Sequence, residues 1–554
     1  MKKHILSLIT ASVPFLLMGQ TAVDAFQLSR NDLRGTARFM SMAGAFGALG
    51  GDLSTLNQNP GGIGVYRKSE VGITLDIDMQ STKSTTPLYI GKSDQTKAYL
   101  NNLGYVGSFN TASEIVPTFN WGFSYGRTAS FDRRYHGRAN MNGSLSNYIA
   151  GYCTADGIPS DELAGSDDNY FYGSAPWLGM LAYNSYIISP YSNGIDNGYD
   201  GMWQHGTFGS SEFDVEEKGY VDEYSINFGG NISNVVYWGI GFGITDIEYK
   251  QHTYYDETMY DALIPAQRPA AAGDRGEDIK DGLVADGTTT GNGGYSLTSY
   301  KRMTGNGFNF KVGLIFRPIN ELRLGFAVHT PTYYSIDETS WGEIDYDFNY
   351  TEGPLKPYYT GTPDDIRSWK FRTPWRLMFS AAGIIGTKGI ISVDYEYRPY
   401  QNMKVTPANS YYFDSSVEND MTNDIQNYYQ SSNIIRIGGE YRITPNFSLR
   451  AGYAYETSST KSGVTDIDSD VMVYTSNPWD TGTTPSYTMD NSTQYITCGA
   501  GYRYKNFSVD AAYVHKSQKS EFFSYTPYNG YATPYSADIK SNHNNIVLSV
   551  GYRF

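Results

Sequence analysis

Side chains able to do chemistry are few in this chain, and they are not grouped. Asp466, Asp468 and Asp470 have a carboxylate spacing suited to Ca²⁺, but Val471 replaces the glycine of an EF-hand loop and no Glu follows at the twelfth position. The 7 His residues are scattered, and the Gly-x-Ser-x-Gly and His-Glu-x-x-His motifs are absent. We therefore expect no enzyme, no metal site and no cofactor.

A second set of charged residues occupies alternate positions of two consecutive stretches, 433–443 and 447–457. Its members are Arg436, Glu440, Arg442, Arg450 and Glu456. If the turn between the stretches pairs Ile443 with Phe447, Glu440 faces Arg450 directly and Arg436 lies diagonal to Glu456. The favoured interpretation is that these residues form structural ion pairs between two neighbouring strands. The alternative is that they form a site for a ligand carboxylate.

The elements that position these residues are strands with one apolar face. In the last ten residues, Ile546, Leu548, Val550, Tyr552 and Phe554 alternate with polar or small residues. A strand crosses a bilayer in about 9–11 residues, and such strands must close into a barrel. Similar stretches are 70–80, 116–126, an irregular one near 131–143, two that flank Ser233-Asn234, 306–317, 322–335, 375–385, 390–399, 433–443, 447–457, 493–504 and 507–517.

The connections between these stretches alternate in length. Short turns are expected at 127–131, 233–234, 318–321, 386–389, 444–446 and 505–506, and long loops separate the remaining strands. This asymmetry is typical of outer-membrane barrels, with the short turns on the periplasmic side. The sequence thus predicts an all-β fold, a 14-stranded antiparallel transmembrane β-barrel over 70–554. Tyr552 and Phe554 are its expected closing signal for the barrel-assembly machinery.

The amino terminus predicts export. Lys2, Lys3 and His4 precede an apolar run over 5–18, which is the pattern of a signal peptide over 1–19, with cleavage after Ala25 as the alternative. We therefore expect the outer membrane of a Gram-negative bacterium, surrounded by its lipid. The 50 Tyr suit aromatic girdles. A net charge of −15 argues against a nucleic-acid partner, and Cys153 and Cys498 are expected to be unpaired thiols.

Residues 20–69 carry no strand alternation and are rich in Gly and Ala. Within them, Gly44-Ala-Phe46, Gly51-Asp52-Leu-Ser54 and Asn59-Pro60-Gly61-Gly62 form an ordered series of motifs. This series, followed by fourteen strands, resembles the FadL/TodX-type outer-membrane transporters of long-chain fatty acids and aromatic hydrocarbons, including Bacteroidetes-type members. The motif is confined to about 26–66, and Gly61 stands where Ala is usual in that family.

The resemblance implies a role for several residues. It implies that residues 20–69 fold back as a hatch that plugs the barrel, with Gly44, Asp52, Asn59, Pro60 and Gly61 as its motif. Apolar residues of the hatch would line a ligand pocket, namely Phe39, Met40 and Phe46. The third strand would be kinked inward and open a lateral exit near Arg134 and His136. The alternative is that the charges of 131–143 lie at the rim and the strand boundary is misplaced.

The favoured function is therefore outer-membrane transport of hydrophobic small molecules by passive diffusion through a porin-like, hatch-plugged barrel. One alternative is a structural or secretion-associated barrel without small-molecule transport. A second alternative is a lipid-acting barrel enzyme, which no catalytic motif in the sequence supports.

Overall fold

The structure is a computed structural model, and it describes residues 19–164, 170–171, 175–190, 198–263, 290–350, 353–354, 358–407, 415–462, 464, 482–526 and 534–554. Residues 1–18 of the predicted signal peptide (1–19) and the acidic stretch Asp466 to Asp470 lie outside the described residues. No helix among the described residues combines the length and the apolar character needed to cross a bilayer.

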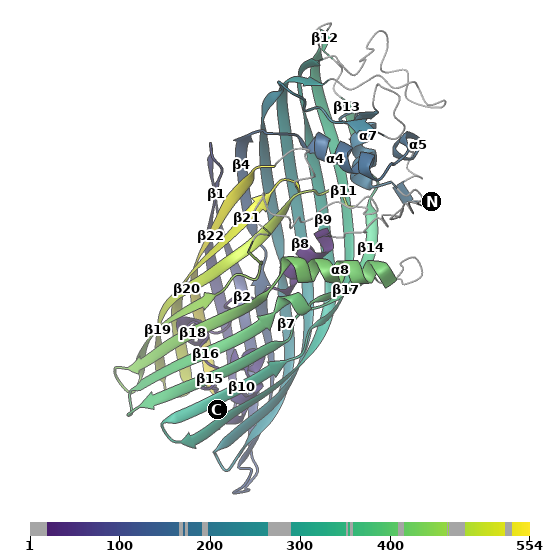
Figure 1. The fold of residues 1–554 in the computed structure, drawn as a ribbon. Helices are drawn as coiled ribbons and strands as arrows, with labels where there is room; N and C mark the ends of the chain where they lie inside the picture. Colours follow the sequence, from purple (N-terminus) through teal and green to yellow (C-terminus); the bar gives the residue numbers. More distant parts are fainter. Residues whose placement is uncertain are drawn as a thin grey trace, which may run out of the picture.

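Fourteen antiparallel strands form a closed barrel (Figure 1). In their order around the barrel they are β1 (Glu70–Thr85), β2 (Ile90–Asn110), β3 (Thr118–Ser130), β7 (Phe208–Ile232), β8 (Val236–Leu263), β9 (Thr290–Ile319), β10 (Leu322–His329), β15 (Arg376–Ile385), β16 (Gly389–Pro399), β18 (Ser431–Arg442), β19 (Phe447–Glu456), β20 (Tyr487–Tyr504), β21 (Phe507–Phe523) and β22 (Ser536–Arg553). The barrel closes where β22 pairs with β1, so that Val71 faces Tyr552. The predicted strand count and closing strand are confirmed.

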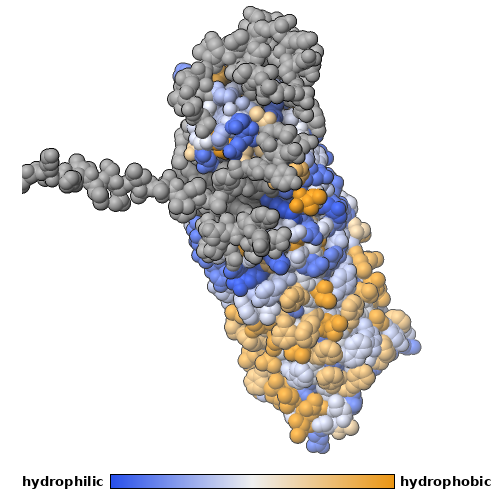
Figure 2. All heavy atoms as spheres, turned by 90° about the vertical axis from the view of Figure 1, so that its right-hand side faces the viewer, coloured by the Kyte–Doolittle hydropathy of each residue, from blue (hydrophilic) through white to orange (hydrophobic). Residues whose placement is uncertain are grey.

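The two-residue alternation of each strand sorts side chains between the outer surface and the interior. On β1, Ile73 is 45% exposed whereas Thr74 and Asp76 are buried. Phe242, Ile437 and Leu548 are outward-facing and exposed in the same way on other strands. Figure 2 shows that, on the face in view, apolar side chains gather over the part of the barrel toward the short turns, with hydrophilic surface beyond them. An apolar band of this kind is what a bilayer requires of a barrel.

Short turns gather at one end of the barrel, and the connections at the other end are long except for residues 86–89 between β1 and β2. At the predicted turn between β7 and β8, Ser233 and Asn234 both have left-handed backbone, with φ of 50° and 57°. The four turns predicted at 318–321, 386–389, 444–446 and 505–506 also join consecutive strands at this end. The predicted turn at 127–131 is wrong, because β3 runs through it, and the short turn lies at 111–117.

Strand β2 is the main error of the sequence-based assignment, which placed its residues in a loop. In its upper half, residues Lys92 to Leu100 alternate between exposed and half-buried, and there is no buried apolar face. The stretch 131–143, predicted as a separate strand, instead contains β4 (Arg133–Asn140), which continues β3 beyond a break at Phe131-Asp132. The count of fourteen survives because one missed strand offsets one divided strand.

Several strands and helices extend the barrel beyond the apolar band. The strand extensions are β4, β11 (Tyr333–Tyr350), β12 (Gly353–Pro354), β13 (Tyr358–Gly361), β14 (Asp365–Arg372) and β17 (Lys404–Pro407), with the small pair β5 (Ser189–Pro190) and β6 (Tyr199–Asp200). The helices are α4 (Leu145–Ala155), α5 (Ser160–Leu163), α7 (Trp177–Asn184), η2 (Tyr400–Asn402) and α8 (Ser415–Tyr428). Helices α4 and α7 share a hydrophobic core with inward residues of the extended strands, among them Phe213, Leu297 and Ile344.

The N-terminal segment, defined here as residues 22–66, packs against the inner faces of the strands. It contains most of α1 (Gly19–Ser29), then α2 (Ala37–Ser41), α3 (Thr55–Gln58) and the 3-10 helix η1 (Pro60–Val65). Most of its residues are buried. Helix η1 contacts β7, β8 and β9, and α2 contacts β20, β21 and β22. The segment therefore reaches wall strands on opposite sides of the barrel.

Candidate functional site: the N-terminal segment and the adjoining cavity

The Asn59-Pro60 motif forms the turn that begins η1. Pro60 occupies the first helical position, where its missing N–H costs no hydrogen bond. The Asn59 side chain donates to the carbonyl of Gly47 at 2.6 Å and to that of Leu314 at 3.3 Å, and it accepts from the N–H of Gly61 at 3.0 Å. One side chain thus ties the turn to itself, to the preceding loop and to β9.

Two other motif residues hold the N-terminal segment together. The Asp52 carboxylate accepts from the hydroxyl of Thr36 at 2.7 Å and from the N–H of Ser54 at 3.0 Å. Thr36 in turn caps α2, because its hydroxyl accepts from the N–H of Phe39. Gly44 has a φ of +74°, and a Cβ there would lie 2.8 Å from Leu33.

Phe39, Met40 and Phe46, which we expected to line a ligand pocket, lie in a packed apolar cluster. They are at most 6% exposed, and the Phe39 and Phe46 rings lie 5.6 Å apart. Their cluster includes small wall residues such as Ala382, Ala454 and Ala512. None of the three lines the 460 Å³ cavity described below or three smaller cavities of the described residues.

Polar side chains of the wall bind the backbone of the N-terminal segment from several strands. Asp394 of β16 accepts from the N–H of Gly47 at 2.9 Å. Further contacts of this kind come from β2, β3, β10, β20 and β22, through Asn101, Asn120, His329, Thr497 and Ser549. The segment also approaches the wall closely at Gly239 of β8, since a Cβ there would lie 2.1 Å from the Pro60 carbonyl oxygen.

Ion pairs attach the part of the segment before α2 to the wall. Asp24 binds Lys301 at 2.7 Å, Arg30 binds Asp490 at 3.0 Å, and Arg34 binds Asp76 at 3.0 Å. Asp32 binds Lys516 at 2.6 Å. Burial raises the pKa of Asp24 to about 6 in spite of Lys301. Burial also opposes ionisation of Asp32, but Lys516, Arg34 and Arg30 together hold the pKa of that carboxyl below its usual range.

The predicted ion pair between Glu440 and Arg450 is confirmed, and it belongs to a larger network. Arg450 Nε donates to Glu440 at 2.6 Å, and Arg450 Nη1 donates to Asp510 at 2.6 Å. Arg38 of the N-terminal segment donates to the same Glu440 at 3.1 Å. Arg436 lies diagonal to Glu456 as predicted, because Arg436 faces Ala454 and Ile434 faces Glu456. Its ion pair, however, is with Glu396 of the neighbouring strand, at 2.7 Å.

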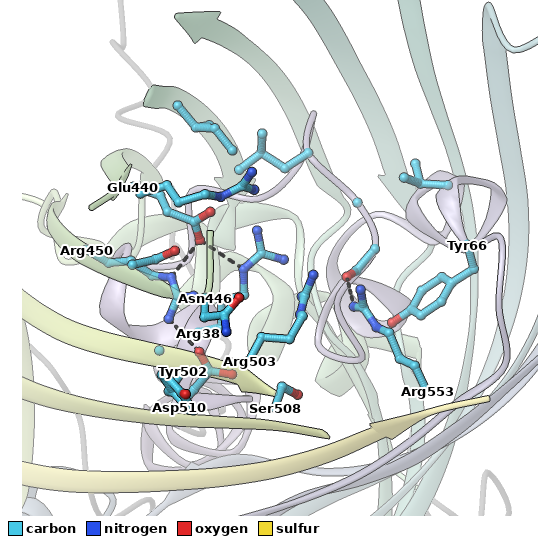
Figure 3. Close-up of a pocket in the computed structure, with 18 of the residues that line it drawn as sticks. Arg38, Tyr66, Glu440, Asn446, Arg450, Tyr502, Arg503, Ser508, Asp510 and Arg553 are labelled. Carbon is cyan, nitrogen blue, oxygen red and sulfur yellow. Dashed lines mark hydrogen bonds and ion pairs between the residues drawn. The ribbon is translucent and has the colours of Figure 1, made fainter. Parts of the chain in front are cut away.

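A cavity of about 460 Å³ lies between the N-terminal segment and the short turns (Figure 3). Its lining includes eight cationic side chains, Arg38, Arg67, Lys68, Arg323, Arg442, Arg450, Arg503 and Arg553, and two carboxylates, Glu440 and Asp510. Sequence reasoning missed this cavity because its residues come from separate turns. The available signal was that basic residues recur where the strands end.

A seam interrupts the wall between β2 and β3. The two strands pair only up to Asn102 and Gly126, and within the described residues no strand pairs with that edge of β2 from Ile90 to Asn101. Side chains bridge the seam instead: Lys97 and Tyr99 both donate to Asp132, the latter at 2.6 Å. Tyr99 faces Asp76 in the β1 register, level with outward-facing Leu75 and Ile77, so the seam reaches the apolar band.

Beyond the seam, β4 is displaced toward the interior. The buried hydroxyls of Ser84 on β1 and of Thr86, which directly follows β1, donate to the carbonyls of His136 and Arg138. Arg134 points outward and binds Asp214 at 2.7 Å on the exposed surface. His136 is half-buried. Neither side chain lines the 460 Å³ cavity or the three smaller ones.

The C-terminal aromatic residues lie at the rim where the barrel closes. The Tyr552 and Phe507 rings are 4.7 Å apart, and Tyr552 is 5.9 Å from Phe554. The N–H of Phe554 donates to the carbonyl of Ser69, just before β1. Within the described residues, no group of three metal-ligating side chains was found. Cys153 and Cys498 are both free, the first buried and the second exposed.

Comparison with protein-family models gives no match, and neither does comparison with curated proteins. Among solved structures, the chain is similar to a Pseudomonas aeruginosa FadL homologue, with 14% identity, a TM-score of 0.49 and coverage of 95% of this chain and 99% of that chain. It is similar to the P. putida toluene transporter TodX (13%, 0.44, 94% and 99%) and to the CymD monoaromatic hydrocarbon channel (10%, 0.42, 95% and 99%). At these identities the likeness concerns the fold alone.

Proposed function

We propose that this chain is an outer-membrane channel for hydrophobic small molecules, such as long-chain fatty acids or similar lipophilic compounds. The observation that carries the proposal is the seam between β2 and β3, because it reaches the apolar band. A side opening at that depth leads into lipid rather than into water. Only a molecule that partitions into a bilayer gains from such a route, at roughly 0.8 kcal/mol for each CH₂ kept away from water.

In this proposal the N-terminal segment is the hatch, and it blocks the direct axial path for water-soluble solutes. Its burial and its hydrogen bonds to strands around the barrel support this role. We also place signal-peptide cleavage after Gly19, since Ala22, Val23 and Ala25 of α1 are buried. Cleavage after Ala25 would remove more than half of that helix.

The ligand would leave sideways by passive diffusion down its gradient. Lys97, Tyr99 and Asp132 bridge the seam, so these side chains must separate for a ligand to pass. The break between β3 and β4 at Phe131-Asp132 gives the wall local freedom to do this, because the β-ladder with β7 shifts register at Arg127. Arg134 and His136 would then lie above the exit rather than in it.

The test is to lock the seam reversibly. Lys97→Cys and Asp132→Cys are combined with Cys498→Ser, which removes the exposed native thiol, whereas Cys153 is buried. A reducible bis-thiosulfonate then joins the two introduced cysteines. Cells carrying this variant should lose uptake of radiolabelled oleate and of toluene on cross-linking and regain it on reduction.

A matched pair on an intact part of the wall controls for the chemistry. Tyr220 and Asp246 contact each other at 3.2 Å across the continuous ladder between β7 and β8. Cross-linking Tyr220→Cys to Asp246→Cys should leave uptake unchanged. Normal uptake through a cross-linked seam would refute the lateral route, and equal loss in both pairs would show a nonspecific effect.

A further inference from the structure

We propose that the 460 Å³ cavity beside the short turns binds a phosphate-type oxyanion, either free in solution or carried by a lipid headgroup. This site goes beyond the proposed transport of hydrophobic molecules. It involves none of the residues that bridge the seam, so either proposal can fail without the other.

The first argument is the charge left over after pairing. Arg38 and Arg450 bind Glu440 and Asp510, and Arg553 binds Glu70 at 2.8 Å. The remaining cationic side chains of the lining are Arg67, Lys68, Arg323, Arg442 and Arg503. Within the part of the chain that the structure describes, none of these five makes an ion pair. Five unpaired cations around one cavity repel one another, and a multivalent anion between them relieves that repulsion.

The second argument is the hydrogen-bonding capacity of the lining. Arg323 donates through Nη1 to the carbonyl of Leu49 at 2.7 Å, while its Nε is buried and has no partner among the described residues. Guanidinium groups present several N–H donors in one plane, which match the oxygens of phosphate. Figure 3 shows Arg503 between the group formed by Arg38, Glu440 and Arg450 on one side and Arg553 on the other. A ligand beside Arg503 would therefore reach both groups.

The third argument is the setting of the cavity. Its volume of about 460 Å³ lies in the range of small-molecule sites, roughly 300–1,000 Å³. The wall and the N-terminal segment form the sides of a partly open cleft, and a cleft whose low-dielectric walls carry charges of one sign focuses their field on an anion. The internal carboxylate of Glu440 already accepts from two arginines here, so the lining is built to hold acidic oxygens.

An anion in this position would also join two parts of the molecule. Arg38 and Arg67 belong to or directly follow the N-terminal segment, whereas Arg442 and Arg503 are at the ends of β18 and β20. An oxyanion that contacts both groups should therefore stabilise the docked segment, in proportion to its affinity and concentration.

The experiment uses the full-length protein in a non-ionic detergent and measures binding calorimetrically. Inorganic phosphate is the free-anion probe, and dihexanoyl phosphatidic acid is the lipid-headgroup probe, each compared with sodium chloride at equal ionic strength. The test variant is Arg442→Gln with Arg503→Gln, both exposed at the cavity. The control is Lys388→Gln with Lys505→Gln, which removes the same charge from exposed turns at the same end but outside the cavity lining.

We expect at least one probe to bind the wild type, and the test variant to weaken this binding at least tenfold. The control should stay within twofold, and Arg442→Lys with Arg503→Lys should retain most of the affinity. The tighter of the two probes identifies the source of the anion. The proposal is overturned if neither probe binds better than chloride, or if the control loses as much affinity as the test variant.

Discussion

Gly61 lies against Gly313 of β9 so closely that a Cβ on Gly61 would come within 2.9 Å of the Gly313 carbonyl carbon. The neighbouring Asn59 side chain fills the space above Gly313, where a Cβ would lie 1.9 Å from Asn59 Oδ1. The Asn-Pro-Gly turn and the wall are therefore fitted to each other by two glycines.

Gly61→Ala should loosen the N-terminal segment, because backbone on β9 cannot move aside as a flexible side chain would. Overpacking of this kind costs about 1–3 kcal/mol, which corresponds to a roughly 5- to 150-fold increase in transient opening. The opening is measured as the rate of maleimide labelling of Ala48→Cys, a buried position in the segment, in a Cys498→Ser background.

Gly383→Ala is the matched control for that substitution. Gly383 lies on β15, and a Cβ there would meet nothing within 4 Å. Labelling should therefore be unchanged in this variant. An unchanged rate in Gly61→Ala as well would mean that the close contact does not hold the segment in place.

How far the sequence predicts this fold depends on where each strand lies. Strands such as β1 and β8 face lipid on one side and the packed interior on the other, so their residues alternate and the strands are found easily. The upper half of β2 borders the seam and water. Polar residues such as Lys92, Asp94 and Gln95 are therefore compatible with either face of the strand. Without a two-sided environment there is no period of two to detect.

The candidate functional site likewise has parts that the sequence predicts and parts that it does not. The Asn59-Pro60 turn and the Glu440–Arg450 pair are local, since a turn type or a hairpin register is enough to predict them. The cavity at the short turns depends on residues as distant in sequence as Arg67 and Arg503. No local pattern brings these together, because only closure of the barrel makes them neighbours. The sequence likewise assigned Phe39 and Phe46 correctly to an apolar environment, but not to a packed one.

Glu257→Gln should loosen the helices beyond the apolar band. Glu257 is fully buried, and its two oxygens accept from the hydroxyls of Ser144, Tyr255 and Tyr295 and from the N–H of Leu145, the first residue of α4. In the Glu257→Gln variant, an NH₂ group replaces one carboxylate oxygen and faces hydroxyl or N–H groups that donated to that oxygen, which costs about 1–3 kcal/mol of unfolding free energy. Limited chymotrypsin digestion of α4 and α5 should become faster.

Asp256→Asn, on the other face of the same strand, is the control and should be digested at the rate of the wild type. Equal rates in all three proteins would contradict this role of Glu257.

Deleting residues 552–554 should prevent assembly of the barrel. The deletion removes the ladder pairs of Tyr552 with Val71 and Phe507, and the ion pair of Arg553 with Glu70. Without these contacts, the ladder between β22 and β1 that closes the barrel should open from the rim. The assay is heat-modifiable mobility in electrophoresis of outer-membrane fractions, where assembled barrels run faster before boiling. Tyr504→Ser, which removes an exposed aromatic side chain at the same rim, should assemble normally. Normal assembly of the truncated protein would mean that the closing residues are dispensable.

Two aspartates of the N-terminal segment should respond to pH in opposite directions. Asp24 is buried beside Lys301, with Glu338 and Arg367 nearby, and its pKa is raised to about 6. An acid with a raised pKa contributes stability that is present below about pH 4 and is lost as the pH rises through about 6. The pKa of Asp32 is lowered, so its contribution is present above about pH 4 and is lost only on strong acidification.

The same substitution at the two positions should therefore have opposite effects at neutral pH. Asp24→Asn keeps the uncharged form at every pH, so this variant should be as stable as the wild type at pH 4. At pH 7 its free energy of unfolding should be higher than that of the wild type by at most roughly 3 kcal/mol, which raises its thermal midpoint. Asp32→Asn should be less stable than the wild type at pH 7, because it removes a carboxylate that Lys516 binds at 2.6 Å. Thermal unfolding of both variants in detergent at pH 4 and pH 7 gives the comparison. A lower midpoint for Asp24→Asn at pH 7 would show that attraction to Lys301 outweighs the cost of burying the charge.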